Sequence, residues 1–182
     1  MDAFVESCLN ATRFPDPQER VHRLLEELIS EPAKVRSVLG EIQPDHSRSA
    51  QYQFLYQSSE LTVLHVVTPG LFRSPPHNHL AWVVVGMYEG AERHTFYRRV
   101  GDRLVQESVK DTFAPQLIVL DPDAIHGIAN PLATPSRGLH VYGGTLANPA
   151  RSLWNPFTLQ EQPFELAELS RYENLLNPDP TV

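Results

Sequence analysis

Residues 75–90 read PPHNHLAWVVVGMYEG, and the interpretation of the whole chain starts from them. The two prolines stiffen the approach to an apolar run that begins at Trp82. Successive side chains of a strand point to opposite faces, so His77 and His79 would point the same way and could offer two imidazoles to one ion. This stretch predicts a strand over residues 78–87 with a pair of metal ligands at its mouth.

A second histidine element lies further along the chain, in residues 121–130, which read DPDAIHGIAN. Its histidine, His126, is the candidate third ligand. Three neutral imidazoles on one side of a divalent metal leave coordination positions open for substrate and O2. This favours an iron-dependent oxygenase, although zinc, copper and nickel also accept imidazole. Four further histidines are interpreted as surface or hydrogen-bonded core residues, namely His22, His46, His65 and His94.

The residues around these elements alternate with period two and are rich in β-branched and aromatic side chains. Turn residues such as Pro69-Gly70, Glu89-Gly90 and Gly101-Asp102 separate the runs. Many short strands with regular turns are typical of an all-β barrel or sandwich. Strands are expected near residues 51–57, 61–68, 78–87, 91–99, 103–109, 116–121, 125–129 and 137–143.

Helices are expected on both sides of this β region. Asp16-Pro17 supplies a cap and a proline at the first helical position, and an apolar stripe at helical spacing follows over residues 21–29. A second short helix is expected from Glu31-Pro32 to Ile42, then a polar connector over 43–49. A C-terminal helix is expected over residues 165–172. The chain is therefore predicted to be one domain, residues 1–182, with a helical N-terminal layer (1–45), a metal-binding β-barrel (50–145) and a C-terminal extension (146–182).

The composition is that of an ordinary folded protein with an excess of acidic residues. The chain has 182 residues, 41% of them hydrophobic and 20% charged, with a net charge of -7. Nucleic acid and anionic membranes are therefore not expected as partners. No apolar run approaches the roughly 20 residues of a membrane span, and the first residues lack the order of a secretory signal. Cys8 is the only cysteine, so no intrachain disulfide is possible and a cytoplasmic location is expected.

The two histidine elements resemble the two conserved motifs of the cupin superfamily, whose members are small double-sheet β-barrels. The resemblance implies an all-β core with the cupin jelly roll, here preceded by a helical layer and followed by a short extension. A glutamate ligand usually follows the histidine pair in the first cupin motif. The corresponding stretch of this chain, residues 80–84, contains no carboxylate. This departure implies a site of three histidines without a glutamate.

Longer strings are similar to the thiol dioxygenases of the cysteine dioxygenase family, most of all to bacterial members that include the 3-mercaptopropionate dioxygenases. The strings are SPPHNHLAWVVVGMYEGAE, DAIHGIAN and GLHVYGG, within residues 50–145. The resemblance implies a mononuclear Fe(2+) held by His77, His79 and His126. It also implies a His-x-Tyr pair, in which Tyr142 presents its phenol to oxygen or substrate and His140 orients that phenol.

Three positions depart from the family pattern. Val83 stands where mammalian-type enzymes have the cysteine that crosslinks to the active-site tyrosine, so no Cys-Tyr crosslink is expected. Gly138 stands where family members have a serine that completes a hydrogen-bond relay with the His-x-Tyr pair. That relay is expected to be truncated or filled by water. Asn78 replaces the usual aspartate between the first two ligands and should point away from the metal.

The resemblance also suggests where a substrate would be held. Cysteine-specific members bind the substrate carboxylate with an arginine on an early strand, and the matching place here falls near Gln53, with Gln51 as the alternative. A glutamine there is similar to the 3-mercaptopropionate type and would bind a carboxylate by neutral hydrogen bonds. Arg73, just before the metal motif, could supply charge instead. Trp82 of the motif is assigned to the same substrate site.

These features predict a cytoplasmic iron(II) enzyme, monomer or homodimer, that oxidises a small thiol carboxylate to its sulfinic acid with O2. The substrate is expected to be 3-mercaptopropionate or a related thiol rather than cysteine. Two alternatives stay open. One is another metal-dependent cupin enzyme, such as a dioxygenase or isomerase of a small acid. The other is a non-catalytic cupin that binds a small molecule in a metal-dependent way.

Overall fold

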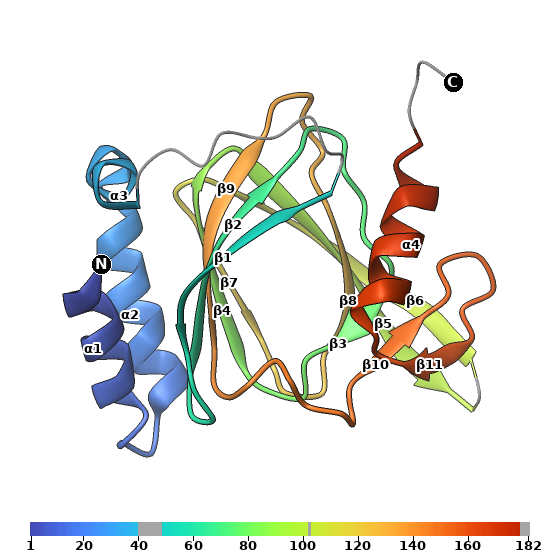
Figure 1. Ribbon diagram of the computed structural model, residues 1–182, viewed down its shortest axis with the longest axis horizontal. Helices are drawn as coiled ribbons and strands as arrows, with labels where there is room; N and C mark the ends of the chain where they lie inside the picture. The colour runs from blue at the N-terminus through green and yellow to red at the C-terminus, as the bar shows by residue number, and fades with distance from the viewer. Residues whose placement is uncertain (40–48, 102, 179–182) are drawn as a thin grey trace.

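Two antiparallel β-sheets face each other, with helices packed beside them (Figure 1). The computed structural model describes residues 1–39, 49–101 and 103–178. Helices in these residues are α1 (Asp2–Ala11), α2 (Pro17–Ile29), α3 (Pro32–Leu39) and α4 (Leu166–Leu176). Strands are β1 (Gln51–Gln57), β2 (Thr62–Thr68), β3 (His77–Asn78), β4 (Val83–Glu89), β5 (Ala91–Val100), β6 (Arg103–Phe113), β7 (Leu117–Leu120), β8 (Ile125–Ala129), β9 (Ser136–Tyr142), β10 (Ser152–Trp154) and β11 (Glu161–Pro163).

The strand order is that of a jelly roll. Among strands β2 to β9, one sheet has the order β2-β9-β4-β7 and the other has the order β3-β8-β5-β6. The chain crosses repeatedly between the sheets, as in the double-sheet jelly rolls to which cupins belong. Strand β1 adds to the edge of the first sheet, and β10 and β11 add to the edge of the second. The predicted fold class is confirmed, as two facing sheets rather than one closed barrel.

The five-stranded sheet is apolar on both faces. Val83 and Val85 of β4 point inward, into the space between the sheets. Val84, between them, points outward and packs with residues of the N-terminal helices. This alternation follows from the pleat of a strand. It explains why the run after the histidine pair is continuously apolar instead of alternating with polar residues.

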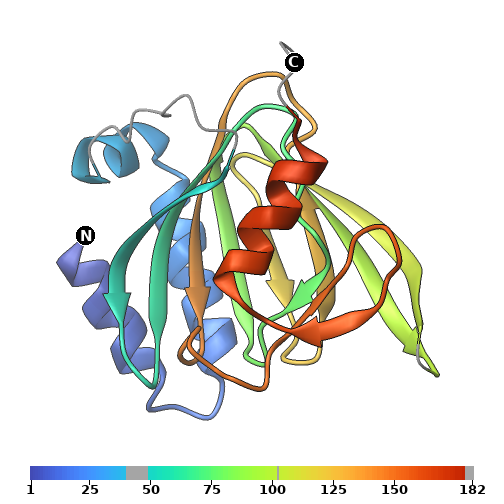
Figure 2. The same cartoon turned by 45° about the vertical axis from the view of Figure 1, so that its right-hand side comes forward.

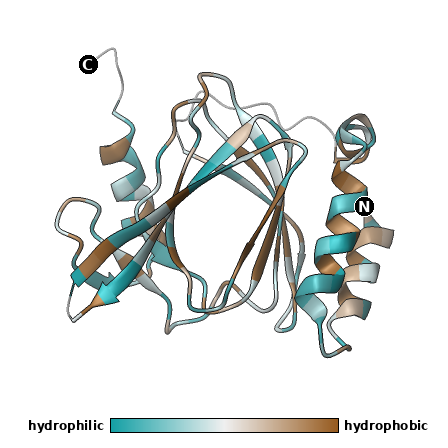
Figure 3. Cartoon of the chain, turned by 180° about the vertical axis from the view of Figure 1, so that it is seen from behind, coloured by the Kyte–Doolittle hydropathy of each residue, from teal (hydrophilic) through white to brown (hydrophobic). Residues whose placement is uncertain are grey.

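The predicted N-terminal helical layer covers the outer face of that sheet (Figure 1). Helix α2 begins at Pro17 as expected and buries Val21, Leu25 and Ile29. Hydrophobic and hydrophilic stretches alternate along these helices (Figure 3). Cys8 of α1 is also in this layer, and its burial raises the pKa of the thiol to about 12, which leaves it unreactive. The predicted end of the second helix near Ile42, and most of the connector with His46, lie outside the described residues.

Two parts of the strand prediction were wrong. The strand expected over 78–87 is two strands, β3 and β4, in different sheets. The break lies at Leu80, whose φ of 53° is in the left-handed region that leucine rarely adopts. The C-terminal extension contains β10 and β11, which were not expected, in addition to the predicted helix. None of the helices in the described part of the chain is long and apolar enough to cross a membrane.

Candidate metal centre

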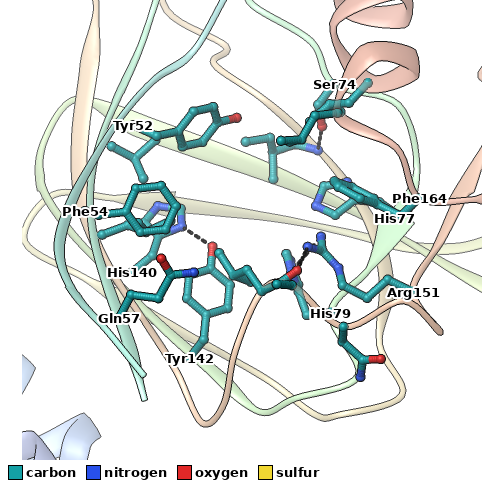
Figure 4. Close-up of a pocket in the computed structure, with 18 of the residues that line it drawn as sticks. Tyr52, Phe54, Gln57, Ser74, His77, His79, His140, Tyr142, Arg151 and Phe164 are labelled. Carbon is teal, nitrogen blue, oxygen red and sulfur yellow. Dashed lines mark hydrogen bonds between the residues drawn. The ribbon is translucent and has the colours of Figure 1, made fainter. Parts of the chain in front are cut away.

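The three predicted ligands converge between the sheets. His77 on β3 is paired directly with His126 on β8, and His79 follows immediately after β3. One ring nitrogen from each of the three lies within 4.8 Å of the others. The closest approach is 3.1 Å, between Nε2 of His79 and Nε2 of His126. Figure 4 shows His77 and His79 facing the same cavity.

The protonation states of these rings suit metal binding. The Nδ1–H of His77 donates to the carbonyl of Pro75 at 3.0 Å, which leaves Nε2 free as a ligand. Burial lowers the pKa of His77 to about 4, and it lowers the pKa values of His79 and His126 as well. The rings are therefore neutral near pH 7. Neutral imidazole is the form that binds a metal ion.

The donor set fits a divalent transition metal. Two neutral imidazoles whose lone pairs face each other across 3.1 Å repel, unless a proton or a cation lies between them. Imidazole suits iron, copper, nickel and zinc, and the described residues offer no carboxylate to the cluster. The triad could hold such an ion, and its composition does not distinguish among these metals.

The sequence did not predict that His94 and Glu92 form a buried pair next to His126. His94 of β5, expected to be a structural histidine, stacks on His126 with ring centroids 5.3 Å apart and an angle of 7°. The two Nδ1 atoms are 3.1 Å apart, so the Nδ1–H of His126 can donate to His94 while Nε2 of His126 stays available to a metal. The signal was present, because Glu92 and His94 are two apart on a strand and share its inward face.

Glu92 completes this arrangement at the bottom of the site. One of its carboxylate oxygens lies 2.9 Å from Nε2 of His94, although the contact is not aligned as a hydrogen bond. Burial acts to raise the pKa of this carboxyl, but the nearby His94 outweighs it and the net pKa is lowered. A carboxylate that supports a ligand histidine through a second ring fixes the tautomer and orientation of the ligand.

The His-x-Tyr pair faces the same cavity. His140 and Tyr142 lie on the inward face of β9, and the Tyr142 hydroxyl is 3.2 Å from Nδ1 of His140 (Figure 4). The Tyr142 ring is 5.0 Å from the ring of His79, centroid to centroid. Burial raises the pKa of Tyr142 and lowers the pKa of His140, so the phenol keeps its proton and the imidazole is neutral.

Gly138 lies at the position where a serine would complete the hydrogen-bond relay with the His-x-Tyr pair. A Cβ atom there would lie 3.4 Å from Nε2 of His140 and 2.9 Å from Sδ of Met87. Met87 therefore occupies space that a serine side chain would need. Nε2 of His140 is buried without a hydrogen-bond partner in the described residues.

Gln53 does not reach the cavity. Tyr52 and Phe54 line it, and the pleat directs Gln53 between them to the opposite face, where its Oε1 lies 3.4 Å from Nδ1 of His65. Gln51, the alternative, shares that face. A β-bulge between Phe54 and Tyr56 shifts the alternation, so the glutamine on the cavity is Gln57. His65 is a hydrogen-bonded core residue as expected, 2.6 Å from the Tyr88 hydroxyl.

The other two predicted substrate residues also lie away from the cavity. Arg73 is exposed, and its backbone is bonded to the side chain of Asn177. Trp82 immediately precedes β4 and packs against the cluster that joins the helical layer to the sheet. Its indole packs so closely on Gly143 that a Cβ atom there would be 2.0 Å from the ring.

Arg151 brings a cation to the cavity, and no motif in the sequence predicted it. It is 5% exposed, donates to the carbonyls of Asn78 and Leu146, and has one Nη2 atom 3.5 Å from Nδ1 of His79. The guanidinium also lies 3.8 Å above the ring of Phe164. Two of the five N–H groups of the guanidinium donate to the carbonyls of Asn78 and Leu146. If His79 binds a metal through Nε2, its Nδ1 carries the proton and accepts no hydrogen bond, so the other three N–H groups have no acceptor in the described residues.

The cavity in front of the histidines has a volume of about 590 Å³. Helix α4 crosses in front of the facing sheets (Figure 2) and contributes to the cavity wall. Most of the wall is apolar, and the polar groups gather around the histidine triad and at a few further positions. Apolar wall residues include Phe54, Leu64, Val66, Ile128, Leu166 and Leu169.

The sequence matches no family model and none of the curated proteins. Similar solved structures include a RmlC-like cupin family protein from Methanocaldococcus jannaschii, with 13% identity over 58% of this chain and 89% of that one, at a TM-score of 0.46. Another is an uncharacterised double-stranded β-helix protein from Klebsiella pneumoniae, with 13% identity, 62% and 84% coverage and a TM-score of 0.49. A RmlC-like cupin from Shewanella frigidimarina has 18% identity, 56% and 81% coverage and a TM-score of 0.45.

At these identities and TM-scores, the similarities carry no argument about activity. The strand order and the histidine cluster stand independently of them. The chain therefore has the jelly-roll fold of the cupins, with a cluster of three histidines that could bind a metal ion.

Proposed function

We propose that this protein is an iron(II)-dependent thiol dioxygenase that converts a thiol carboxylate to its sulfinate. The observation that carries the proposal is the position of the Tyr142 phenol, which lies beside the ring of His79 and is held by His140. A three-histidine site with a His-x-Tyr pair facing the same cavity is what the resemblance to bacterial thiol dioxygenases leads us to expect. The absence of a carboxylate from the ligand cluster of the described residues agrees with it.

When bound, ferrous iron would supply the positions at which the thiolate and O2 meet, and both oxygen atoms of O2 end on sulfur. The reaction R–S⁻ + O2 → R–SO2⁻ balances without a further reductant. Tyr142 is protonated, so its hydroxyl can donate a hydrogen bond to oxygen or sulfur while the Nδ1–H of His140 donates to the phenol oxygen. His94 and Glu92 would hold the ring of His126 in its ligand orientation.

We assign the carboxylate of the substrate to Arg151 instead of Gln53 or Arg73. Arg151 lines the cavity next to His79, and beyond its two bonds to carbonyls its N–H groups have no acceptor in the described residues. A buried guanidinium can bind a carboxylate through two parallel charge-assisted hydrogen bonds. The carbonyls of Asn78 and Leu146 fix the guanidinium, so little freedom is lost when the substrate binds.

Metal analysis combined with O2 uptake tests the proposal. Iron-loaded protein should consume thiol and O2 in equal amounts with 3-mercaptopropionate or a longer thiol carboxylate, and the product should be the sulfinate. Tyr142→Phe should keep its iron and lose about 100- to 10,000-fold in kcat, because the proton-donating hydroxyl is removed. His126→Ala should lose iron while the protein stays folded. An iron-loaded protein that oxidises no thiol carboxylate would refute the proposal.

One observation favours a second candidate, another metal-dependent cupin reaction on a larger acid. The cavity of about 590 Å³ is in the range of pockets that hold drug-sized ligands, roughly 300–1,000 Å³. A thiol of two or three carbons would leave much of it to water. Product analysis separates the two candidates, since carbon–carbon cleavage or isomerisation produces no sulfinate.

A further inference from the structure

Helix α4 brings a buried acid to the cavity. Its cavity face consists of Leu166, Leu169 and Glu173, which are three and four residues apart and so lie on one side of the helix. Glu173 is 4% exposed. Its Oε1 has no hydrogen-bond partner in the part of the chain that the structure describes. An acid thus stands where the apolar face of the helix would call for a leucine.

The described residues place no hydrogen-bond donor or cation on Oε1 of this buried carboxyl. A buried ionised group is costly unless it is paired, and burial raises the pKa of Glu173 to about 7. Tyr52, across the cavity wall, is another titratable group near it. A ligand that brings a positive charge or a strong hydrogen-bond donor would supply the missing partner.

The wall of the same cavity therefore carries two groups of opposite charge, a guanidinium and a carboxylate. Arg151 lies beside the histidine triad, and beyond its two bonds to carbonyls its N–H groups have no acceptor in the described residues. Glu173 belongs to the helix that lies over the cavity, and its Oε1 contacts no cation in the part of the chain that the structure describes. Apolar side chains such as Phe54, Val66 and Leu169 line the wall as well. This arrangement suits an elongated ligand with an acid at one end and a base at the other.

We propose that Glu173 binds the protonated amine of an elongated ligand whose carboxylate is held by Arg151. The inference extends the proposed function, and it depends on that function only for the expectation that the ligand contains a thiol. The substrate class becomes a thiol with a carboxylate near the sulfur and an amine at its distant end. The size of the cavity, which exceeds what a small thiol carboxylate fills, agrees with this class.

Calorimetric titration of the full-length protein with two series of linear acids tests the inference without turnover. One series is the ω-amino acids from 6-aminohexanoate to 12-aminododecanoate, and the other is the methyl-ended acids of matching length. At least one ω-amino acid should bind about tenfold or more tightly than its methyl-ended match, since a charge-assisted hydrogen bond forms in a buried place. The chain length with the largest ratio then reports the span between Arg151 and Glu173.

Two variants identify the residue responsible. Glu173→Gln, which keeps the shape of the side chain, should bring the affinity ratio close to one, and near-ultraviolet circular dichroism checks its fold. Glu165→Gln, at an exposed glutamate just before α4, is the matched control and should leave the ratio unchanged. A wild-type ratio near one, or a ratio that Glu173→Gln does not lower, would overturn the inference.

The outcome is separable from that of the proposed function. If the amine preference is present and no thiol is oxidised, the thiol dioxygenase proposal alone fails. If thiol oxidation occurs and the preference is absent, the role of Glu173 alone fails.

Discussion

Replacing Glu173 by glutamine should stabilise the ligand-free protein, and the gain should grow as the pH rises. Burial raises the pKa of this carboxyl from 4.5 to about 7. Each pKa unit corresponds to about 1.4 kcal/mol, so the ionised side chain lowers the free energy of unfolding by about 3 kcal/mol near pH 8. Glutamine has nearly the same shape and carries no charge, so it avoids this cost.

The sign follows from proton binding. Between pH 4.5 and 7 the folded protein holds a proton on Glu173 that the unfolded chain has already released. The unfolded state then binds fewer protons, so the free energy of unfolding falls as the pH rises. The contribution of this carboxyl is fully present below pH 4.5 and is lost through about pH 7, where the curve levels off.

Urea denaturation of both proteins at several pH values between 5 and 8 measures the effect. Over that range the difference in free energy of unfolding should widen by roughly 2.5 kcal/mol in favour of Glu173→Gln. Other titrating groups affect both proteins equally and cancel in the difference. The exposed control Glu165→Gln should show a constant difference. A constant difference for Glu173→Gln would mean that its carboxyl is solvated or paired in the folded state, and the reasoning would be refuted.

Three further substitutions test other parts of the structure. His94→Phe preserves a ring stacked on His126 but removes the Nδ1 acceptor, so metal affinity should fall about 10- to 100-fold in a competition with a chelator. Gly143→Ala places a methyl group inside the Trp82 ring and should cost about 1–3 kcal/mol in urea denaturation, with partial rescue by Trp82→Leu. Leu25→Ala opens a cavity between α2 and β4 and should cost about 2–5 kcal/mol, while the metal content per folded chain stays unchanged. Loss of metal in folded Leu25→Ala would contradict the separation of the helical layer from the site.

The sequence predicted that three histidines would lie together because their spacing follows from simple strand geometry. His77 and His79 are two apart, and the second element brings His126 opposite the first. The short runs with period two and regular turns predicted an all-β barrel or sandwich. The jelly roll itself was predicted from the resemblance of the two histidine elements to the cupin motifs. The break at Leu80 was not predictable, because neither glycine nor proline marks it and a leucine stands at the positive φ.

The residues that line the rest of the cavity were predicted less well, for two physical reasons. A strand can be predicted at the correct residues while its side chains are assigned to the wrong faces, because a shift of one residue moves every side chain to the opposite face. In β1 the prediction placed Gln53 at the cavity, whereas the bulge near Leu55 brings Gln57 there. The second reason is that Arg151 and Glu173 come from the C-terminal extension, where no repeat or spacing relates them to the histidine motifs.

The C-terminal extension helps to position the histidine cluster. Strand β10 pairs with β3 through Leu153 and His77, so it supports the strand that carries the first histidine of the cluster. The side chain of Asn78 accepts a hydrogen bond from the backbone of Ser152 at 2.7 Å, while its carbonyl accepts one from Arg151 at 2.9 Å. An aspartate would also accept the first of these bonds, but it would leave a buried negative charge beside the ligands. Asparagine at this position therefore ties the extension to the ligand strand without changing the charge of the site, and the same contact sets Arg151 at the edge of the cavity where a substrate carboxylate would bind.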